Sequence, residues 1–304
     1  MEVEEKMNIG AVVVTYNPDI ALLKEAVNSL ANQIDEMLIV DNGSEQIDAI
    51  CRIVDSVSNL SVHTLNENTG IAHATNVGLN HFMAKEYDYV ITCDQDSVFD
   101  SDYVSNFIKI LESDPDVDNI AAFVPVYYDE VKNEVSPVYV RSKFFYKALP
   151  MTYEKIDVSQ AIASGMIINL TALRPIGLMD EELFIDWVDT EWCWRANAKG
   201  WLIRSYRSLM MRHSLGDATK RLLGKTFAVH SSVRSYYIIR NGLYIALNKK
   251  YPDLPFRIIL FSKTVILAAV FVLLENAKPN YILSSAWAVY DGVAGNIGKT
   301  KRSL

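Results

Sequence analysis

The first third of the chain alternates short apolar runs with stretches whose apolar residues recur at helical spacing. Residues 9–15 are small or β-branched and show no polar alternation, which is typical of a strand covered on both faces. Tyr16, Asn17 and Pro18 break this run. Apolar residues then recur at helical spacing, at Leu22, Leu23, Ala26, Val27 and Leu30. The pattern predicts a strand, a loop and a helix, in that order.

The same unit repeats along the chain. Strands are predicted at residues 37–40 and 60–65, and each is followed by a helical stretch, the second over about 71–86. A fourth strand begins near Tyr87 and ends in the sequence Asp94-Gln95-Asp96. Alternation of this kind predicts an α/β fold with a mostly parallel sheet and right-handed crossovers. A ligand is then expected at the carboxyl ends of the strands.

Polar loops follow these strands at the edge where a ligand is expected. They comprise residues 15–17, 41–44, 66–70 and 94–96. Each loop alone fits an ordinary turn, because Asn, Asp and Gly are common turn residues. Four such loops along one edge of a sheet favour a binding site.

Two carboxylates, Asp94 and Asp96, stand one residue apart at the tip of an apolar strand. An uncompensated pair of like charges in such a place is costly, so a divalent cation is predicted there. His213 ends a later apolar run over residues 209–216. It is either a structural histidine or a third ligand of that cation.

The middle of the chain is less regular. A helix is expected at about residues 102–111 and a strand at 120–126, after which residues 127–157 are irregular, aromatic and mixed in charge. Such a segment is interpreted as a lid or recognition surface, with crossing hairpins as the alternative. Residues 161–170 return to strand character.

Residues 184–201 combine carboxylates with three tryptophans. Asp189 is placed to cap a helix that ends near Gly200, and capping alone is one interpretation of it. The other interpretation is a sugar pocket, since aromatic rings pack on sugar faces and carboxylates accept hydrogen bonds from hydroxyl groups. The nearby Asp186 and Glu191 favour that second interpretation.

The C-terminal part reads as two or three helices from about residue 232. Residues 258–274 are apolar except for Ser262, Lys263 and Thr264, and they fall short of the roughly 20 apolar residues of a membrane span. A buried core helix and a segment in the membrane interface are the two interpretations. Flanking basic and aromatic residues favour the interface.

Charge separates the C-terminal part from the rest. The formal net charge is -8, and residues 249–304 hold eight Lys and Arg against three acids, so the tail carries about +5 and the remainder about -13. An acidic body argues against nucleic acid as a partner, whereas a basic apolar tail suits an anionic membrane surface. Three scattered cysteines and an N-terminus without signal-peptide features predict a cytoplasmic protein.

Several motifs carry a resemblance when taken in order: VVVTYNP, VDNGS, LNENTGIAHATNVG, DQD, FIDWVDTEWCWRANAKGW and RHSLG. Together they resemble the family 2 glycosyltransferases of GT-A fold, and more narrowly the bacterial rhamnosyltransferases of O-antigen and polysaccharide assembly. The resemblance implies a catalytic domain over residues 1–225, with a nucleotide-binding part at about 1–97 and an acceptor-binding part at about 98–225. Residues 226–304 then form a helical region at the membrane interface.

The resemblance also implies roles for individual residues. Asp96, Asp94 and His213 would hold Mn2+ or Mg2+, and the histidine favours Mn2+. The nucleotide would bind to Thr15, Tyr16, Asn17, Asp41, Asn68, Gly70, Asn76, Asp94 and Gln95. Asp41 would accept a hydrogen bond from the pyrimidine N3–H.

The catalytic base implied by the resemblance is Asp189, with Asp186 as second choice. The family places a Glu-Asp pair here, and this chain has Val188 at the Glu position. In an inverting displacement the base removes a proton from the acceptor hydroxyl while the metal neutralises the leaving group. The acceptor would lie on Asp186, Trp187, Glu191 and Trp192.

The implied reaction moves rhamnose from dTDP-rhamnose to a lipid-linked glycan, at the inner face of the plasma membrane. The same fold with a UDP-hexose donor is one alternative, and a non-catalytic scaffold subunit that binds nucleotide sugars is another. A nucleotidyltransferase is disfavoured, because no glycine-rich basic loop follows the first strand. The oligomeric state is left open.

Overall fold

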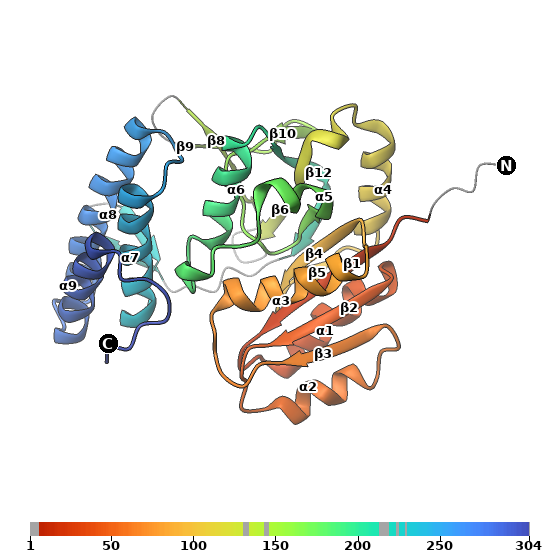
Figure 1. Ribbon diagram of the computed structural model, residues 1–304, viewed down its shortest axis with the longest axis horizontal. Coiled ribbons are helices and arrows are strands. Elements are labelled where there is room, and N and C mark those ends of the chain that lie inside the picture. Colours follow the sequence, from red (N-terminus) through yellow and green to blue (C-terminus); the bar gives the residue numbers. More distant parts are fainter. Residues whose placement is uncertain are drawn as a thin grey trace.

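The computed structural model describes residues 6–129, 134–142, 146–212, 219–222, 225–228 and 230–303. Within these residues, one large sheet carries helices on both faces, and three further helices stand together beside it (Figure 1). The α/β class predicted from the alternating pattern is confirmed.

The first part of the sheet repeats a strand-helix unit. Its elements are β1 (Ile9–Thr15), α1 (Ile20–Leu30), β2 (Glu36–Asp41), α2 (Ile47–Val54), β3 (Leu60–Thr64), α3 (Ile71–Ala84) and β4 (Tyr89–Asp94). Strand β1 lies between β2 and β4 and is parallel to both, and β3 lies parallel on the far side of β2. The carboxyl ends of these strands therefore meet at one edge, as predicted.

The second part of the sheet is mixed in direction. Its strands are β5 (Val98–Phe99), β6 (Ile120–Asp129), β7 (Glu134–Val135), β10 (Lys155–Asp157), β11 (Met166–Asn169) and β12 (Leu202–Arg212). The order across the sheet is β10-β12-β6-β11-β4-β1-β2-β3, with β5 beside β12 and β7 beside β6. Strand β11 is antiparallel to β4 and β6, whereas β6 and β12 are parallel.

The irregular segment after β6 folds partly as a hairpin. Its strands are β8 (Val138–Arg141) and β9 (Tyr146–Leu149), and Tyr139 forms an isolated bridge with Gln160. The hairpin interpretation therefore describes this part of the structure, and movement as a lid stays a prediction. A second hairpin, β13 (Thr219–Leu222) with β14 (Lys225–Ala228), follows β12.

Helices cover both faces of the sheet, which explains the uninterrupted apolar character of β1. Ala11 and Val13 pack in a core shared with α1, α2 and α4 (Tyr103–Ser113), whereas Val12 packs in the opposite core with α3, α5 (Leu170–Ile176) and α6 (Val188–Ala198). Because successive side chains of a strand point to opposite faces, both sets must be apolar. Three short 3-10 turns occur at Ala31–Gln33, Val117–Asn119 and Glu181–Leu183.

Helix α3 approaches the sheet closely through a glycine. A Cβ atom added to Gly78 would lie 2.4 Å from the Cγ atoms of Val12. Glycine therefore lowers helix propensity here but allows α3 to seat directly on β1.

Three helices form a separate bundle beside the sheet: α7 (Ser232–Asn248), α8 (Leu254–Leu274) and α9 (Pro279–Ala294) (Figure 1). Their core includes Tyr236 and Tyr237 of α7 and also Phe184, from the loop that precedes α6. The bundle thus shares packed residues with the sheet part. The division of the chain near residue 225 stays a prediction.

Helix α8 is buried along one stripe and exposed on the other face. Its buried residues are Phe256, Leu260, Thr264, Ala268, Phe271 and Leu274. Its exposed apolar residues include Leu254, Ile258, Ile266 and Leu273. By length and composition alone the helix could cross a membrane, with 28% of its most apolar window buried, but this is weak evidence because soluble core helices pass the same test. A fully buried core helix is excluded by the exposed face.

Candidate active site

The carboxyl ends of β1 and β2 are joined by side-chain hydrogen bonds. Thr15 and Asp41 are register partners, and the Thr15 Oγ1 donates to Asp41 Oδ1 at 2.9 Å. The backbone N–H of Ser44 donates to Asp41 Oδ2 at 2.9 Å. Both Thr15 and Asp41 are buried, with Asp41 1% exposed. The Asp41 carboxylate is therefore fixed in orientation by its neighbours.

Hydrogen bonds also join the loop after β1 to the loops after β4 and β2. The backbone N–H of Tyr16 donates to Gln95 Oε1 at 2.9 Å, and that of Asn17 donates to Ser44 Oγ at 2.8 Å. Asn17 has a positive φ of 46°, which asparagine tolerates better than most residues. The Tyr16 side chain stays 47% exposed. An exposed aromatic ring on a fixed backbone is suited to stacking on a planar ligand.

Asn42 connects the loop after β2 to the loop after β3. It was not among the predicted site residues, and its place beside Asp41 was the available signal. Its Nδ2 donates to Asn68 Oδ1 at 3.2 Å, and its Oδ1 accepts from the Thr69 N–H at 2.8 Å. Asn68 Oδ1 also accepts from the Gly70 N–H at 3.0 Å. The predicted nucleotide residues Asn68 and Gly70 are thus brought to the same edge as Asp41.

Gly70 lies against the loop that precedes α6. It has a φ of 94°, and an added Cβ would lie 2.6 Å from both the ring and the carbonyl oxygen of Phe184. The next residue, Ile71, donates its N–H to that carbonyl at 2.8 Å. Only glycine fits this conformation and this gap without strain.

Asn76 of α3 forms hydrogen bonds with Met179 and Glu181, which precede the same loop. Its Oδ1 accepts from the Met179 N–H at 2.9 Å, and its Nδ2 donates to the Met179 carbonyl at 2.9 Å and to Glu181 Oε1 at 2.8 Å. The side chain is 2% exposed. Its hydrogen-bonding groups are used within the protein, so any influence of Asn76 on a nucleotide is indirect.

The tip of β4 presents Asp94, Gln95 and Asp96 as partly buried residues. The Asp96 carboxylate makes no hydrogen bond or ion pair with another described residue. No group of three or more His, Cys, Asp or Glu suited to a metal ion occurs in the described part of the chain. An open carboxylate with a second one nearby fits Mg2+ or Mn2+, which take hard oxygen ligands and complete their shells with water and substrate phosphates.

The proposed third ligand, His213, lies outside the described residues. The last described residue before it, Arg212, pairs with Val98 of β5, two residues after Asp96. The described end of β12 therefore stands beside the turn that carries the carboxylates.

Asp189 lies in the first turn of α6, and the prediction that it caps this helix is wrong. The N-cap is Trp187, whose φ of 67° is left-handed. Asp189 Oδ1 accepts from the Thr190 N–H at 2.7 Å, and its Oδ2 accepts from the Ala163 N–H at 3.2 Å. Burial raises the pKa of Asp189, and these N–H donors oppose that rise only in part. A raised pKa makes this carboxylate a stronger base.

Residue 163 also reaches the strand that ends at Asp94. The Thr92 Oγ1 donates to the carbonyl oxygen of Ala163 at 2.5 Å, and the Gly165 N–H donates to the Thr92 carbonyl at 2.7 Å. The hydroxyl groups of Ser97 and Ser164 hydrogen-bond to each other. The segment 163–165 therefore links β4 and the turn that follows it to Asp189.

The loop before α6 has unusual backbone geometry. Phe184, Asp186 and Trp187 all have positive φ, at 66°, 60° and 67°. Each such non-glycine residue costs about 1–3 kcal/mol and persists only where surrounding contacts hold it. Asp186 Oδ1 accepts from Arg234 Nε at 3.2 Å, and Trp187 Nε1 donates to the Ile238 carbonyl at 2.9 Å. Helix α7 supplies both contacts.

Glu191 and Trp192, predicted to contact the acceptor, are structural residues in this conformation. Both are 0% exposed. Glu191 forms an ion pair with Arg195 at 2.8 Å and accepts from the Tyr251 hydroxyl at 2.6 Å. Trp192 Nε1 donates to the Gly177 carbonyl at 2.9 Å. Their burial leaves no surface for an acceptor, so only Asp186 and Trp187 of that set remain candidates.

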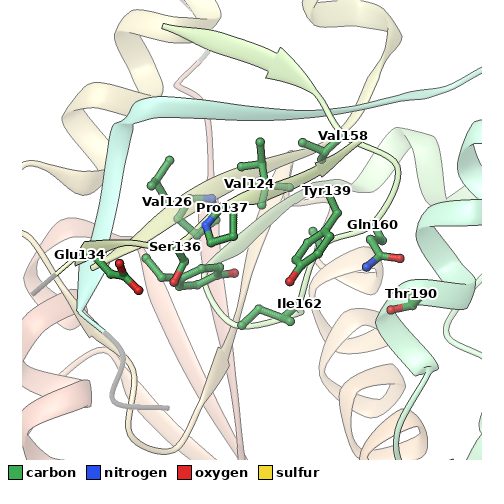
Figure 2. A pocket seen from close by; sticks show the side chains of 14 residues that line it. Val124, Val126, Glu134, Ser136, Pro137, Tyr139, Val158, Gln160, Ile162 and Thr190 are labelled. Carbon is green, nitrogen blue, oxygen red and sulfur yellow. The ribbon is translucent and has the colours of Figure 1, made fainter. Parts of the chain in front are cut away.

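Two adjoining cavities share Thr190, the residue that follows Asp189. The first has a volume of about 350 Å³, and Figure 2 shows Gln160 and Thr190 at one end and Glu134 and Ser136 at the other. The second has a volume of about 400 Å³ and lies between α6 and α8. It shares Gln160 and Thr190 with the first, and its other lining residues are Tyr146, Asp186, Trp187, Trp194, Ile238, Phe256, Ile259, Leu260 and Lys263. Aromatic and polar groups mixed in this way suit a carbohydrate.

Comparison with known sequences supports a glycosyltransferase. A profile for Glycosyl transferase family 2 matches residues 11–176. The dTDP-rhamnosyl transferase RfbF of Shigella flexneri is 31% identical over 304 residues, which covers 96% of this chain and 97% of RfbF. The similarity therefore extends through the helical bundle.

Comparison with solved structures supports the fold. The crystal structure of GalNAc-T7 with UDP, GalNAc and Mn2+ has a TM-score of 0.57 at 15% identity, over 88% of this chain. This chain spans 58% of GalNAc-T7, and the likeness shows the GT-A fold alone. The structure of S. aureus TarS 1–349 has a TM-score of 0.46 at 16% identity, over 97% of this chain and 93% of that fragment.

Proposed function

Because the chain belongs to Glycosyl transferase family 2, we propose that it transfers rhamnose from dTDP-rhamnose to a hydroxyl group of a glycan. It is a glycosyltransferase that resembles bacterial rhamnosyltransferases. The similarity to RfbF over nearly the whole length of both proteins supports the choice of sugar and nucleotide.

One observation carries the assignment of the active site: segment 163–165 bonds both to β4, which ends at Asp94, and to Asp189. This segment would hold the turn with Asp94 and Asp96, proposed for the leaving diphosphate, at a fixed position relative to Asp189, the base proposed for the acceptor. Such a pair of functions on one rigid frame is what a single displacement at the anomeric carbon requires. The displacement inverts that carbon.

Asp189 is the proposed base. Its burial and raised pKa favour proton removal from an acceptor hydroxyl, and its two N–H donors fix the direction of the carboxylate. Asp186 is the alternative, and it lies in the left-handed loop two residues before Val188. Val188 occupies the position where the family has a glutamate, so a single carboxylate serves at this point.

The donor is proposed to bind along the strand edge. Thr15, Asp41 and the exposed ring of Tyr16 would hold the nucleobase of the donor. The residues around the nucleoside would be Asn17, Asn68, Gly70, Asp94 and Gln95. Asn76 would act indirectly, through the loop that it supports. Asp96, Asp94 and His213 would hold Mg2+ or Mn2+. When bound, that cation would supply positive charge to the diphosphate as the sugar leaves.

The acceptor is proposed to enter the two adjoining cavities. Asp186 and Trp187 line the second cavity, and Thr190, next to Asp189, lines both. Helix α8 lines the second cavity through Phe256 and Lys263, and the same helix carries exposed apolar residues such as Ile258 and Ile266. A lipid-linked glycan at the inner face of the plasma membrane fits this arrangement, because its lipid would stay near α8. The proposed catalytic domain covers residues 1–225, and residues 226–304 form the proposed membrane-interface region.

A donor screen tests the function. Purified protein with Mn2+ is mixed with dTDP-rhamnose, UDP-glucose or UDP-galactose, and thermal stabilisation and slow donor hydrolysis are measured. Stabilisation and hydrolysis with dTDP-rhamnose support the proposal. A preference for a UDP-hexose contradicts the choice of donor, and binding without hydrolysis of any donor favours a scaffold subunit.

A further inference from the structure

Two buried polar residues of α7 face the strained loop before α6. Arg240 is 1% exposed and Asn241 is 0% exposed. Asn241 Nδ2 lies 2.8 Å from the carbonyl oxygens of Leu183 and Ile185 and 3.1 Å from that of Asp186. Each of these three carbonyl groups belongs to the residue directly before one with positive φ. One side-chain amide thus fixes the backbone path of the loop.

Arg240 fixes the orientation of that amide. Its Nε donates to Asn241 Oδ1 at 2.8 Å, and its Nη2 donates to the Leu183 carbonyl at 3.0 Å. Because a guanidinium group only donates hydrogen bonds, the amide oxygen of Asn241 must face it. The amide NH2 group must then face the loop carbonyls.

Packing alone does not account for a buried arginine here. No carboxylate of a described residue lies within ion-pair distance of Arg240, and its other hydrogen bonds go to the carbonyls of Gly298 and Glu182. Burial lowers the pKa of Arg240. The guanidinium lies over the rings of Tyr236 and Tyr237, 5.7 and 4.8 Å from their centroids, and its hydrogen bonds go to the Asn241 amide and to backbone carbonyls.

The loop connects three parts of the proposed active site. At Phe184 its carbonyl accepts from the Ile71 N–H, at the start of the helix that follows the donor loop. The Phe184 ring also stacks on Tyr237 of α7 at a centroid distance of 5.0 Å. After Trp187 the chain enters α6, whose first turn carries Asp189. A shift of the loop would therefore move the base relative to the donor.

We propose that Asn241, oriented by Arg240, is a positioning residue for glycosyl transfer, fixing residues 182–187 and through them the carboxylate of Asp189. This inference rests on the proposed role of Asp189. The bundle helix α7 is then part of the catalytic apparatus, in addition to any role at a membrane.

The test compares Asn241→Asp with Asn248→Asp. The first is isosteric but replaces the NH2 donor with an acceptor that faces carbonyl oxygens. The second changes an exposed asparagine near the end of the same helix, whose Nδ2 bonds only to the Tyr244 carbonyl among described residues. Transfer rates, donor KM and the pH profile of kcat are measured at a temperature where circular dichroism shows both variants folded.

We expect kcat of Asn241→Asp to fall at least about tenfold below that of Asn248→Asp, because small displacements of a catalytic group have large effects on rate. The donor KM should stay within about threefold of wild type, and the acidic limb of the pH profile should shift. An unchanged kcat, or a loss that appears only in donor KM, would overturn the proposal.

A second measurement uses only the wild-type protein, so its result does not depend on whether a variant folds. Hydrogen exchange of wild-type protein should show residues 182–187 protected to the same degree as α7. Exchange at the rate of exposed loops would overturn the proposal. Asp189→Asn is assayed in parallel: if it stays active, the proposed base is wrong, whereas an inactive Asp189→Asn with a fully active Asn241→Asp rejects the positioning role alone.

Discussion

Asp189 accepts a hydrogen bond from the backbone N–H of Ala163 at 3.2 Å, while the carbonyl of Ala163 accepts one from Thr92 on β4. One residue therefore couples the proposed base to the strand that presents Asp94 and Asp96. The relationship depends on β11, which runs antiparallel to β4 and brings residues 163–166 back to its carboxyl end. The mixed direction of the sheet is thus what joins the proposed base to the strand edge proposed to bind the donor.

The first prediction concerns the base. Asp189→Asn should lower the transfer rate by about 10²–10⁴-fold, because the amide cannot take a proton, while dTDP protection against thermal unfolding stays unchanged. Asp48→Asn is a matched control, since Asp48 is an exposed carboxylate in the first turn of α2. Near-normal turnover of Asp189→Asn would exclude it as the base.

The pH profile of the wild type follows from the same carboxylate. A base must be ionised, so activity should fall as the pH drops through the pKa of Asp189. Burial raises that pKa above the ordinary aspartate value, so the acidic limb should lie above about pH 4. A limb at or below pH 4 in kcat would contradict the raised pKa or the assignment.

The second prediction concerns the cation. Asp96→Ala should remove the Mn2+ dependence of donor stabilisation, because Asp96 is the open carboxylate of the β4 turn. Treatment of the wild type with EDTA should have the same effect, and added Mn2+ should reverse it. Asp100→Ala is the control, since Asp100 is an exposed residue four positions later. Donor hydrolysis at full rate in EDTA would exclude a metal-dependent reaction.

The strand edge was predictable from the sequence, because runs such as residues 9–15 end in polar residues and parallel strands align their ends. The pattern of residues did not show in the same way that Asp189 and Glu191 have different roles. They are two positions apart on one helix, and the sequence does not say which of them points into the protein. Glu191 is buried because Arg195, one turn later, neutralises it. That Glu-Arg spacing of four was the available signal.

The role of α7 was not predictable from the sequence. Arg240 and Asn241 look like polar positions on the exposed face of an amphipathic helix. Their partners are loop carbonyls 55–58 positions away in sequence. Because every residue has a backbone carbonyl, the pattern of residue types does not indicate which of them accept these hydrogen bonds. The same holds for Ala163, whose backbone, not its methyl group, contacts Asp189.

The third prediction concerns the contact between Gly70 and Phe184, which lies in the loop before α6. Gly70→Ala should destabilise the protein by more than the roughly 1–3 kcal/mol of a non-glycine residue in this positive-φ extended conformation (φ 94°, ψ 154°), because the new Cβ would also overlap Phe184. Gly200→Ala is the control, with a similar φ of 87° and no atom within 4 Å. Equal changes in unfolding free energy would show that the Phe184 contact relaxes at little cost.

The fourth prediction concerns a buried ion cluster that joins α4 to β12. Asp114 accepts from Arg204 Nη1 at 2.9 Å and from the Tyr206 hydroxyl at 2.7 Å. Asp114→Asn should destabilise the protein by about 1.5–3 kcal/mol at pH 7, because it removes a charged acceptor from a buried hydrogen-bond network while Arg204 keeps its ion pairs with Asp157 and Asp116. Asp116→Asn should have an effect under about 1 kcal/mol, since that carboxylate is 49% exposed.

The pH dependence of this cluster has a definite sign. Burial alone would raise the pKa of Asp114, but its hydrogen bonds hold the pKa well below the usual range. Its contribution to stability is therefore complete above the unfolded pKa of about 3.9 and is lost as the pH falls toward the lower folded value. The difference in urea unfolding between wild type and Asp114→Asn should shrink below about pH 4. A difference that stays constant to pH 2 would show that the charge is not its source.

The fifth prediction concerns the exposed face of α8. Ile258 and Ile266 are 59% and 63% exposed on a helix flanked by basic residues. The double change Ile258→Asp and Ile266→Asp should abolish sedimentation with vesicles of phosphatidylglycerol and phosphatidylcholine, because it removes apolar surface and adds repulsion from the anionic lipid. Leu22→Asp on α1, at a 46% exposed residue, is the control. If vesicle binding persists and the double variant instead changes a dimer into a monomer, a second copy of the chain covers this face.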